Sequence, residues 1–216
     1  MADSRQTKIL ILKCNSQSTT PLDLQQESDA IDSIANEAKG HHLTVHIIEG
    51  SQWDDIKTNI ANYDPDIIHF SGHGTNAANL IFESTLASGA SERIGLARVH
   101  EALEPALTGK QFRERPLRAV LLNACFSASD EEACKTLSRA AGAPVIGCGL
   151  PVADQLAIDF SKSFYSYLAE TNDVQQAFKK AESVASSGGD RSRSSGIITL
   201  HVECMCSPLF KLVLHL

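Results

Sequence analysis

The stretch DIIHFSGHG, residues 66–74, joins a run of strand-forming residues directly to a histidine that lies between two glycines. Ile67, Ile68 and Phe70 are residue types that favour a β-strand. Glycine lets the chain turn sharply, and it lets a substrate approach the backbone without a Cβ in the way. The stretch therefore predicts a buried strand that ends by placing His73 in a loop where a substrate passes close to the main chain.

The segments on either side alternate between strand-like and helix-like hydrophobic patterns along the chain. The predicted strands are residues 8–15, 42–50, 66–72, 117–125 and 143–150, with a short strand or hairpin at 79–84, a polar tip at 86–95 and extended segments after residue 196. The predicted helices are residues 21–40, ending at Gly40, 53–63, 96–109, 129–142, capped by Ser129 or Asp130, and 154–184, broken near Asn172. Such alternation predicts an α/β fold in three layers, with a mostly parallel central sheet and helices on both faces.

Size and charge restrict the class of protein. The 216 residues, 43% hydrophobic and 21% charged, suit one domain over residues 1–216, in which we expect residues 1–7 to form a flexible tail and residues 186–196 a flexible loop. A net charge of −7 argues against binding to nucleic acid or to an anionic membrane, because phosphate groups require a clustered positive face. The chain has no apolar run near the ~20 residues that span a bilayer and no apolar N-terminal signal, so we expect a cytoplasmic protein.

The cysteines do not predict a disulfide framework or a metal centre. The chain has six of them: Cys14, Cys125, Cys134, Cys148, Cys204 and Cys206. The alternative is a zinc site in the stretch HVECMC, residues 201–206. A structural zinc site needs four ligands, whereas a Cys-x-Cys pair on a strand only places two thiols on one face. We therefore expect small buried thiols rather than a zinc site.

A second strand ends in a residue that carries chemistry. The stretch LRAVLLNAC, residues 117–125, ends at Cys125, just as the strand at residues 66–72 is followed by His73. In parallel sheets, ligands bind at the carboxyl ends of the strands. A thiol attacks as the thiolate, and a neighbouring imidazole can take its proton and later protonate the leaving amine. The backbone amides of Gly74 and Cys125 could stabilise the resulting oxyanion. Taken singly, the first motif could be a simple turn and the second a buried cysteine.

These two motifs carry a resemblance to a known family. HFSGHG, residues 69–74, followed by VLLNACFSAS, residues 120–129, resembles the caspase-like cysteine peptidases. Only Ala124 and Cys125 match the caspase signature itself, whereas Asn-Ala-Cys and the helical segment 153–181 are more similar to the CHAT branch. The resemblance covers residues 8–184, and PLFKL near the C-terminus is similar to the closing strand of that family.

The resemblance implies a caspase-like sandwich that cleaves peptide bonds without a cofactor. It implies a catalytic dyad of His73 and Cys125, with the amides of Gly74 and Cys125 as the oxyanion hole. Many such peptidases select a basic side chain before the cleaved bond, and the metacaspase type uses an aspartate two residues before the nucleophile, where this chain has Asn123. Asp154 is the remaining candidate for a carboxylate in that specificity pocket, called S1, and its alternative role is to cap the helix that it precedes.

Two further residues near the histidine are alternatives for a functional role. His69 lies inside the predicted strand, where a core histidine is expected, and Ser71 is expected to cap the turn.

Peptidases of the CHAT family are commonly joined to sensor parts and act in bacterial defence or cell death. The resemblance therefore implies a regulated cysteine endopeptidase with a protein substrate and an activating or sensor partner, and it leaves the oligomeric state open.

The main alternative is an interaction module that keeps the fold without the chemistry. An amidotransferase-like cysteine hydrolase is disfavoured because NACFS lacks the glycines of a strand-to-helix elbow. A nucleotide binder is disfavoured because the first loop, CNSQSTTPLD, contains no glycine.

Overall fold

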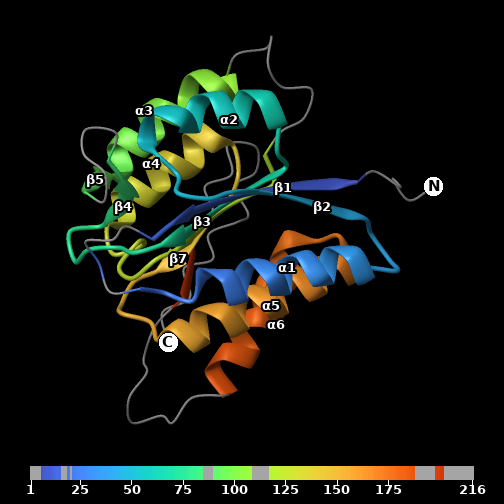
Figure 1. The fold of residues 1–216 in the computed structure, drawn as a ribbon. Coiled ribbons are helices and arrows are strands. Elements are labelled where there is room, and N and C mark those ends of the chain that lie inside the picture. Colours follow the sequence, from blue (N-terminus) through green and yellow to red (C-terminus); the bar gives the residue numbers. More distant parts are fainter. Residues whose placement is uncertain are drawn as a thin grey trace.

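A six-stranded sheet divides the molecule into two helical layers (Figure 1). The computed structural model describes residues 6–15, 19, 21–84, 90–108, 117–187 and 198–201. In spatial order the strands are β2 (Leu43–Ile48), β1 (Thr7–Cys14), β3 (Ile67–Gly72), β6 (Ala119–Asn123), β7 (Val145–Cys148) and β8 (Ile198–His201). The first five run parallel, and β8 pairs antiparallel with β7. The predicted, mostly parallel α/β sandwich is confirmed.

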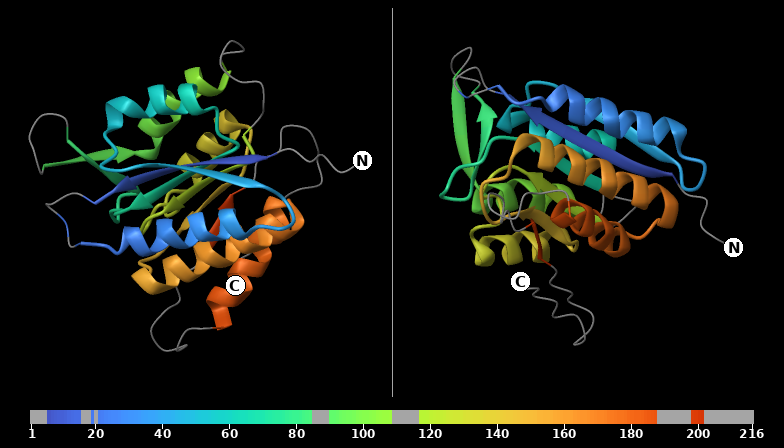
Figure 2. Two further views of the ribbon diagram at one scale, coloured as in Figure 1. Left: turned by 45° about the vertical axis from the view of Figure 1, so that its right-hand side comes forward. Right: turned by 90° about the horizontal axis from the view of Figure 1, so that it is seen from below.

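Each face of the sheet is covered by its own set of helices (Figure 2). One layer contains the 3₁₀ turn η1 (Trp53–Asp55) with α2 (Ile56–Tyr63), α3 (Leu96–Thr108) and α4 (Glu131–Ala141). The other contains α1 (Leu24–Glu37), α5 (Asp154–Thr171) and α6 (Val174–Ser187). The break predicted near Asn172 is confirmed, because this residue ends α5 in the left-handed conformation with φ of 52°.

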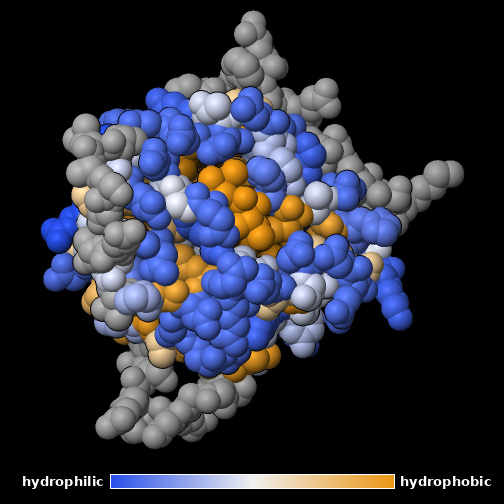
Figure 3. All heavy atoms as spheres, viewed as in Figure 1, coloured by the Kyte–Doolittle hydropathy of each residue, from blue (hydrophilic) through white to orange (hydrophobic). Residues whose placement is uncertain are grey.

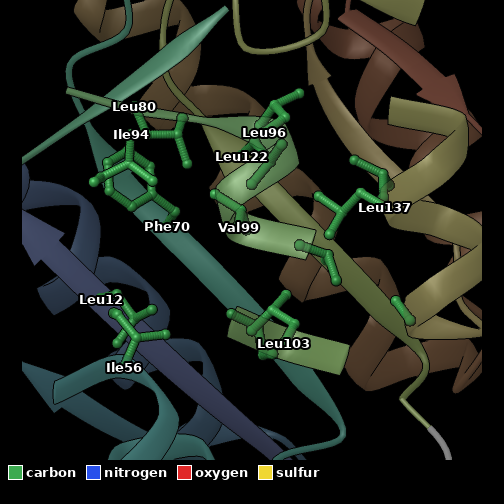
Figure 4. Packing of buried hydrophobic residues seen from close by; sticks show 14 of the residues in the cluster. Leu12, Ile56, Phe70, Leu80, Ile94, Leu96, Val99, Leu103, Leu122 and Leu137 are labelled. Atoms are coloured by element: carbon green, nitrogen blue, oxygen red, sulfur yellow. The ribbon is translucent and has the colours of Figure 1, made fainter. Parts of the chain in front are cut away.

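The central strands are buried on both faces, as their continuous apolar runs predict. Alternate residues of a strand point to opposite faces, so Leu10 and Leu12 pack in one core and Ile9 and Ile11 in the other. Figure 4 shows the first core, in which Leu12, Phe70 and Leu122 come from three neighbouring strands. The helical side chains that meet them include Ile56, Val99, Leu103 and Leu137.

A small separate hairpin follows β3. It consists of β4 (Asn79–Glu83) and β5 (Ser91–Gly95), so the predicted hairpin is present, but residues 91–95 of the predicted polar tip belong to its second strand. The amide of Ile81 donates to the carbonyl of His73 at 3.0 Å, and the amide of Thr75 donates to that of Asn79 at 2.9 Å. The hairpin thus fixes the backbone of the loop that carries His73.

The structure corrects two predicted boundaries, the start of β1 and the end of α1, and it decides between the two predicted caps of α4. Strand β1 begins at Thr7, so the last residue of the predicted N-terminal tail belongs to the sheet. Helix α1 ends at Glu37, before Gly40, where a Cβ would lie 2.7 Å from the carbonyl oxygen of Ala169 and would hinder the packing against α5. Of the two predicted caps of α4, the structure has Asp130, whose carboxylate accepts from the amide of Ala133 at 3.0 Å.

The surface is mostly hydrophilic over the helices, with a hydrophobic band between the two helical layers (Figure 3). Strand β2 forms the edge of the sheet there, and its Val45, Ile47 and Ile48 are half-buried. No helix in the part of the chain that the structure describes is both long enough and apolar enough to cross a membrane. The predicted flexible loop at 186–196 lies outside the described residues except for its first two positions. The C-terminal stretch PLFKL lies wholly outside them.

Candidate active site

The two predicted dyad residues follow neighbouring strands of the sheet. Strands β3 and β6 pair in parallel, with Ser71 opposite Asn123 at the last paired position. His73 and Cys125 each lie two residues beyond that pair, and both line one pocket at the carboxyl edge of the sheet. The fold thus brings into one site two residues that lie far apart in the sequence.

Gly74 allows the two loops to meet. A Cβ at this position would clash with the carbonyl oxygen of Cys125 and would lie 3.2 Å from the Cβ of Ala124. Any side chain larger than hydrogen would therefore push the ends of β3 and β6 apart. The sequence predicts that a substrate approaches this glycine, whereas the group that lies against it in the structure is the backbone of Cys125.

The turn after Cys125 is held in an unusual conformation. Phe126 has a φ of 57°, in the left-handed region that costs a non-glycine residue about 1–2 kcal/mol. Ser127, which is fully buried, donates from Oγ to the carbonyl of Leu122 at 2.7 Å and accepts from the amide of Cys148 at 3.0 Å. The amide of Ala128 also donates to the carbonyl of Cys148, at 2.9 Å. These bonds tie the turn to β6 and β7 and offset its strain.

Cys125 is the half-buried thiol of the site. Its Sγ lies 3.4 Å from the amide nitrogen and 3.7 Å from the carbonyl oxygen of Val152, in the segment between β7 and α5. Cys14, Cys134 and Cys148 are buried. Burial raises the pKa of the Cys134 thiol and that of the Cys148 thiol to about 12, and it raises the pKa of Cys14 further. These three thiols are consequently poor nucleophiles at neutral pH.

The zinc alternative falls mostly outside the described residues, since Cys204 and Cys206 are not among them. Within the described ranges, no three His, Cys, Asp or Glu side chains are grouped so that they could hold a metal ion.

Asp154 lines the same pocket as His73 and Cys125. It does not cap α5: the N-cap is Ala153, and Asp154 is the first helical residue. Its Oδ2 instead accepts a hydrogen bond from the amide of Asp23 at 3.2 Å. Asp23 in turn caps α1, so the N-termini of two helices meet at the wall of the pocket.

A buried carboxylate in the wall of the pocket was missed by the sequence reasoning. Glu27 of α1 is only 3% exposed and accepts hydrogen bonds from Ser71 Oγ, from Asn123 Nδ2 at 2.5 Å and from Ser161 Oγ at 2.6 Å. The prediction that Ser71 caps the turn is therefore wrong, because its hydroxyl donates to this carboxylate instead. The available signal was the position of Glu27 between Leu24 and Ile31 on the apolar face of a predicted helix, where an acidic residue is unexpected.

His69 belongs to the same network and is the core histidine that the sequence predicts, with no exposed surface. Its Nδ1 lies 3.0 Å from the hydroxyl oxygen of Tyr165, and its Nε2 lies 3.4 Å from Oε1 of Glu27. Burial raises the pKa of Glu27, but the charge of His69 and the hydrogen bonds from Ser161 and Ser71 outweigh this effect. The pKa of Glu27 is therefore lower than its ordinary value, and the carboxylate is ionised at neutral pH.

The model of the CHAT domain family matches residues 2–196 of this sequence. The chain belongs to the CHAT family. Among solved structures, the CHAT fold is similar to that of a secreted C11 cysteine protease from Bacteroides thetaiotaomicron, determined in complex with an irreversible peptide inhibitor. The TM-score is 0.52 at 13% identity, and the alignment covers 83% of this chain and 59% of the protease. The fold is thus caspase-like, and this chain aligns with little more than half of that protease.

Two structures of the pyridoxal kinase from Staphylococcus aureus, in complex with AMP-PCP and with pyridoxal, align less well. Their TM-scores are 0.37 and 0.39 at 14% and 13% identity, covering 91% and 92% of this chain and 98% and 99% of the kinase chains. Scores at this level do not indicate a shared fold. A search of curated proteins found no match.

Proposed function

We propose that this CHAT domain is a cysteine endopeptidase that cleaves a protein substrate with His73 and Cys125 as its catalytic dyad. One observation carries the proposal: both residues line one pocket, at the ends of paired parallel strands. The family membership and the caspase-like fold agree with this chemistry. Burial of the other described thiols leaves Cys125 as the available nucleophile among them.

The reaction begins when His73 takes the proton of the Cys125 thiol. The thiolate attacks the carbonyl carbon of the scissile bond, forming the S–C bond while the π electrons move to the oxygen. His73 then gives its proton to the departing amine as the C–N bond breaks, leaving an acyl-enzyme. Water then attacks the acyl carbon with His73 again as base, the C–S bond breaks and the carboxylic acid product leaves. His73 returns the proton to the sulfur, which regenerates the thiol.

The amides of Gly74 and Cys125 are the proposed oxyanion hole. Considering only the described residues, neither amide donates a backbone hydrogen bond, so both are available to a substrate oxygen. Donors of this kind act in catalysis because they are fixed before the charge develops. The hairpin contacts of His73 and the clamped turn after Cys125 provide that rigidity.

We further propose that the pocket accepts an arginine or lysine side chain at P1, the residue before the cleaved bond. Asp23, Glu27 and Asp154 all line the pocket, and its described lining contains neither Lys nor Arg. Asp154 is exposed and can offer its free carboxylate oxygen to a cation. It is the residue on which this specificity depends.

The physiological role proposed is that of a regulated effector in bacterial defence or cell death, switched on by an activating or sensor protein. This part of the proposal is supported by family membership alone. The experiment that tests the proposed activity is a peptide-library cleavage assay that compares the wild type with Cys125→Ala. Cleavage by the wild type only would support the peptidase and would reveal its preference at P1. No cleavage by either protein would favour the alternative, a catalytically silent interaction module.

A further inference from the structure

Ser71 and Asn123 occupy equivalent places on the two strands that lead to the dyad. They are opposite each other in the sheet register, and each lies two residues before a dyad residue. Both donate a hydrogen bond to the carboxylate of Glu27, which reaches them from α1. One side chain thus connects the ends of β3 and β6 at the point where the chain leaves the sheet.

We propose that Glu27 is a positioning residue whose carboxylate fixes the separation of His73 and Cys125 by tying together the ends of β3 and β6. This inference rests on the proposed function, because it assigns Glu27 a role in the geometry of the proposed dyad. Glu27 acts through Ser71 and Asn123 and is not itself required to contact the substrate.

The surroundings of Glu27 suit this role better than substrate binding. An ionised carboxylate has about four lone-pair directions and no proton to donate. Three are taken by Ser71, Asn123 and Ser161, and Nε2 of His69 lies at 3.4 Å. Most of the accepting capacity of this carboxylate is therefore taken by the protein's own donors, in contrast to that of the exposed Asp154.

The charged and titratable groups around the carboxylate are consistent with a permanent anion. His69 of β3 faces it, and the hydroxyl of Tyr165 on α5 lies behind His69. The pocket side carries His73, Cys125, Asp23 and Asp154. Hydrogen bonds to a charged acceptor are shorter and stronger than those between neutral groups, so this carboxylate holds its donors more firmly than a neutral side chain would.

The chain offers a matched pair of variants that separates positioning from simple stabilisation. Ser71 and Ser161 are both fully or almost fully buried serines that donate to Glu27, but only Ser71 lies on a strand that leads to the dyad. Ser71→Ala removes one hydrogen bond to the carboxylate, and Ser161→Ala removes one hydrogen bond to it together with the longer bond that Ser161 Oγ accepts from Asn123 Nδ2 at 3.3 Å. Equal losses of stability with unequal losses of activity would reveal positioning.

The experiment measures kcat and KM on a cleaved peptide, the thermal midpoint, and the rate of Cys125 alkylation by iodoacetamide from pH 5 to pH 9. We expect Ser71→Ala to lower kcat and the alkylation rate at pH 7 by about tenfold or more, at a nearly unchanged KM, because the imidazole no longer activates the thiol fully. Ser161→Ala should keep both rates within about twofold, while the two thermal midpoints fall by similar amounts. A folded Glu27→Gln variant should show the same losses of kcat and of alkylation rate as Ser71→Ala.

Two outcomes would overturn the inference in distinguishable ways. If Ser71→Ala and Ser161→Ala lose activity and alkylation rate equally, the carboxylate only stabilises the fold and does not position the dyad. If the wild type cleaves no peptide and His73→Ala leaves the alkylation of Cys125 unchanged, the proposed dyad itself fails, and Glu27 has nothing to position.

Discussion

The carbonyl oxygen of Cys125 packs against the α-carbon of Gly74 so closely that no side chain fits between them. This contact joins the two loops that leave β3 and β6, and it lies beside the pocket that His73 and Cys125 line. A glycine is required here by the space available, whatever its φ angle. The glycine after His73 therefore allows the ends of β3 and β6 to lie as close together as they do.

Gly74→Ala should abolish most activity, because the added methyl group must push the loop of Cys125 away from His73. We expect kcat/KM to fall by about a hundredfold or more, since small displacements of reacting groups have effects of this size. Gly142→Ala is the control: nothing lies within 4 Å of its Cβ, but its φ of 60° is unfavourable for alanine. It should lower the free energy of unfolding by about 1 kcal/mol and leave kcat/KM unchanged. A fully active Gly74→Ala enzyme would contradict the proposed geometry.

Cys125→Ala and His73→Ala should each eliminate peptidase activity without unfolding the protein. Neither side chain belongs to the two hydrophobic cores, so the circular dichroism spectrum should not change. Because the two residues act as a unit, the double variant should be scarcely less active than either single one. Substantial peptide cleavage by either single variant would show that the proposed dyad is wrong.

Iodoacetamide should label Cys125 before the other described cysteines in the native protein. Cys14, Cys134 and Cys148 are buried and have raised pKa values, whereas Cys125 is only half-buried and lines the same pocket as His73. Mass spectrometry of peptides after short labelling times measures the order. His73→Ala should slow the labelling of Cys125 and leave the buried cysteines unaffected. Faster labelling of a buried cysteine would speak against an activated Cys125.

The sequence was sufficient to predict the sheet and to place the two candidate residues, His73 and Cys125, at one edge of it. Continuous apolar runs at residues 8–15, 66–72 and 117–125 predict strands buried on both faces, and parallel strands place their carboxyl ends at one edge. His73 and Cys125 were chosen as candidates because each follows such a run. Both line one pocket because β3 and β6 are neighbours in the sheet.

The carboxylate network could not be predicted, because it depends on how the helices pack. Glu27 reaches Ser71 and Asn123 only once α1 lies across the strand ends and against α5, which supplies Ser161. No local pattern connects residues separated by 44, 96 and 134 positions. Ser71 was assigned to a turn for the same reason: a local hydrogen bond is the default expectation for a serine beside a glycine.

The lowered pKa of Glu27 predicts acid sensitivity. A carboxyl group with a lower pKa in the folded state contributes stability above its unfolded value, near 4.5, and this contribution is lost as the pH falls through the folded pKa. The difference in free energy of unfolding between wild type and Glu27→Gln should therefore be largest at pH 7 and should shrink as the pH falls below 4.5, as measured by urea unfolding. Glu37→Gln, on the exposed side of the same helix, should change stability little at pH 7. A difference for Glu27→Gln that does not change with pH would argue against an ionised carboxylate.

Asp154→Asn should reduce cleavage after arginine selectively. The side chain keeps its size, and its amide oxygen can still accept from the amide of Asp23, so the start of α1 and the thermal midpoint should barely change. Removing the charge leaves a bound guanidinium without its partner, which costs several kcal/mol in a desolvated pair. We expect kcat/KM for a P1 arginine substrate to fall by about a hundredfold, at ~1.4 kcal/mol per tenfold, with little change for a neutral P1 residue. Asp159→Asn, on the same helix but outside the pocket, is the control and should leave both rates unchanged. A uniform loss across P1 residues, or an apolar preference in the wild type, would limit Asp154 to holding the start of α1 against α5.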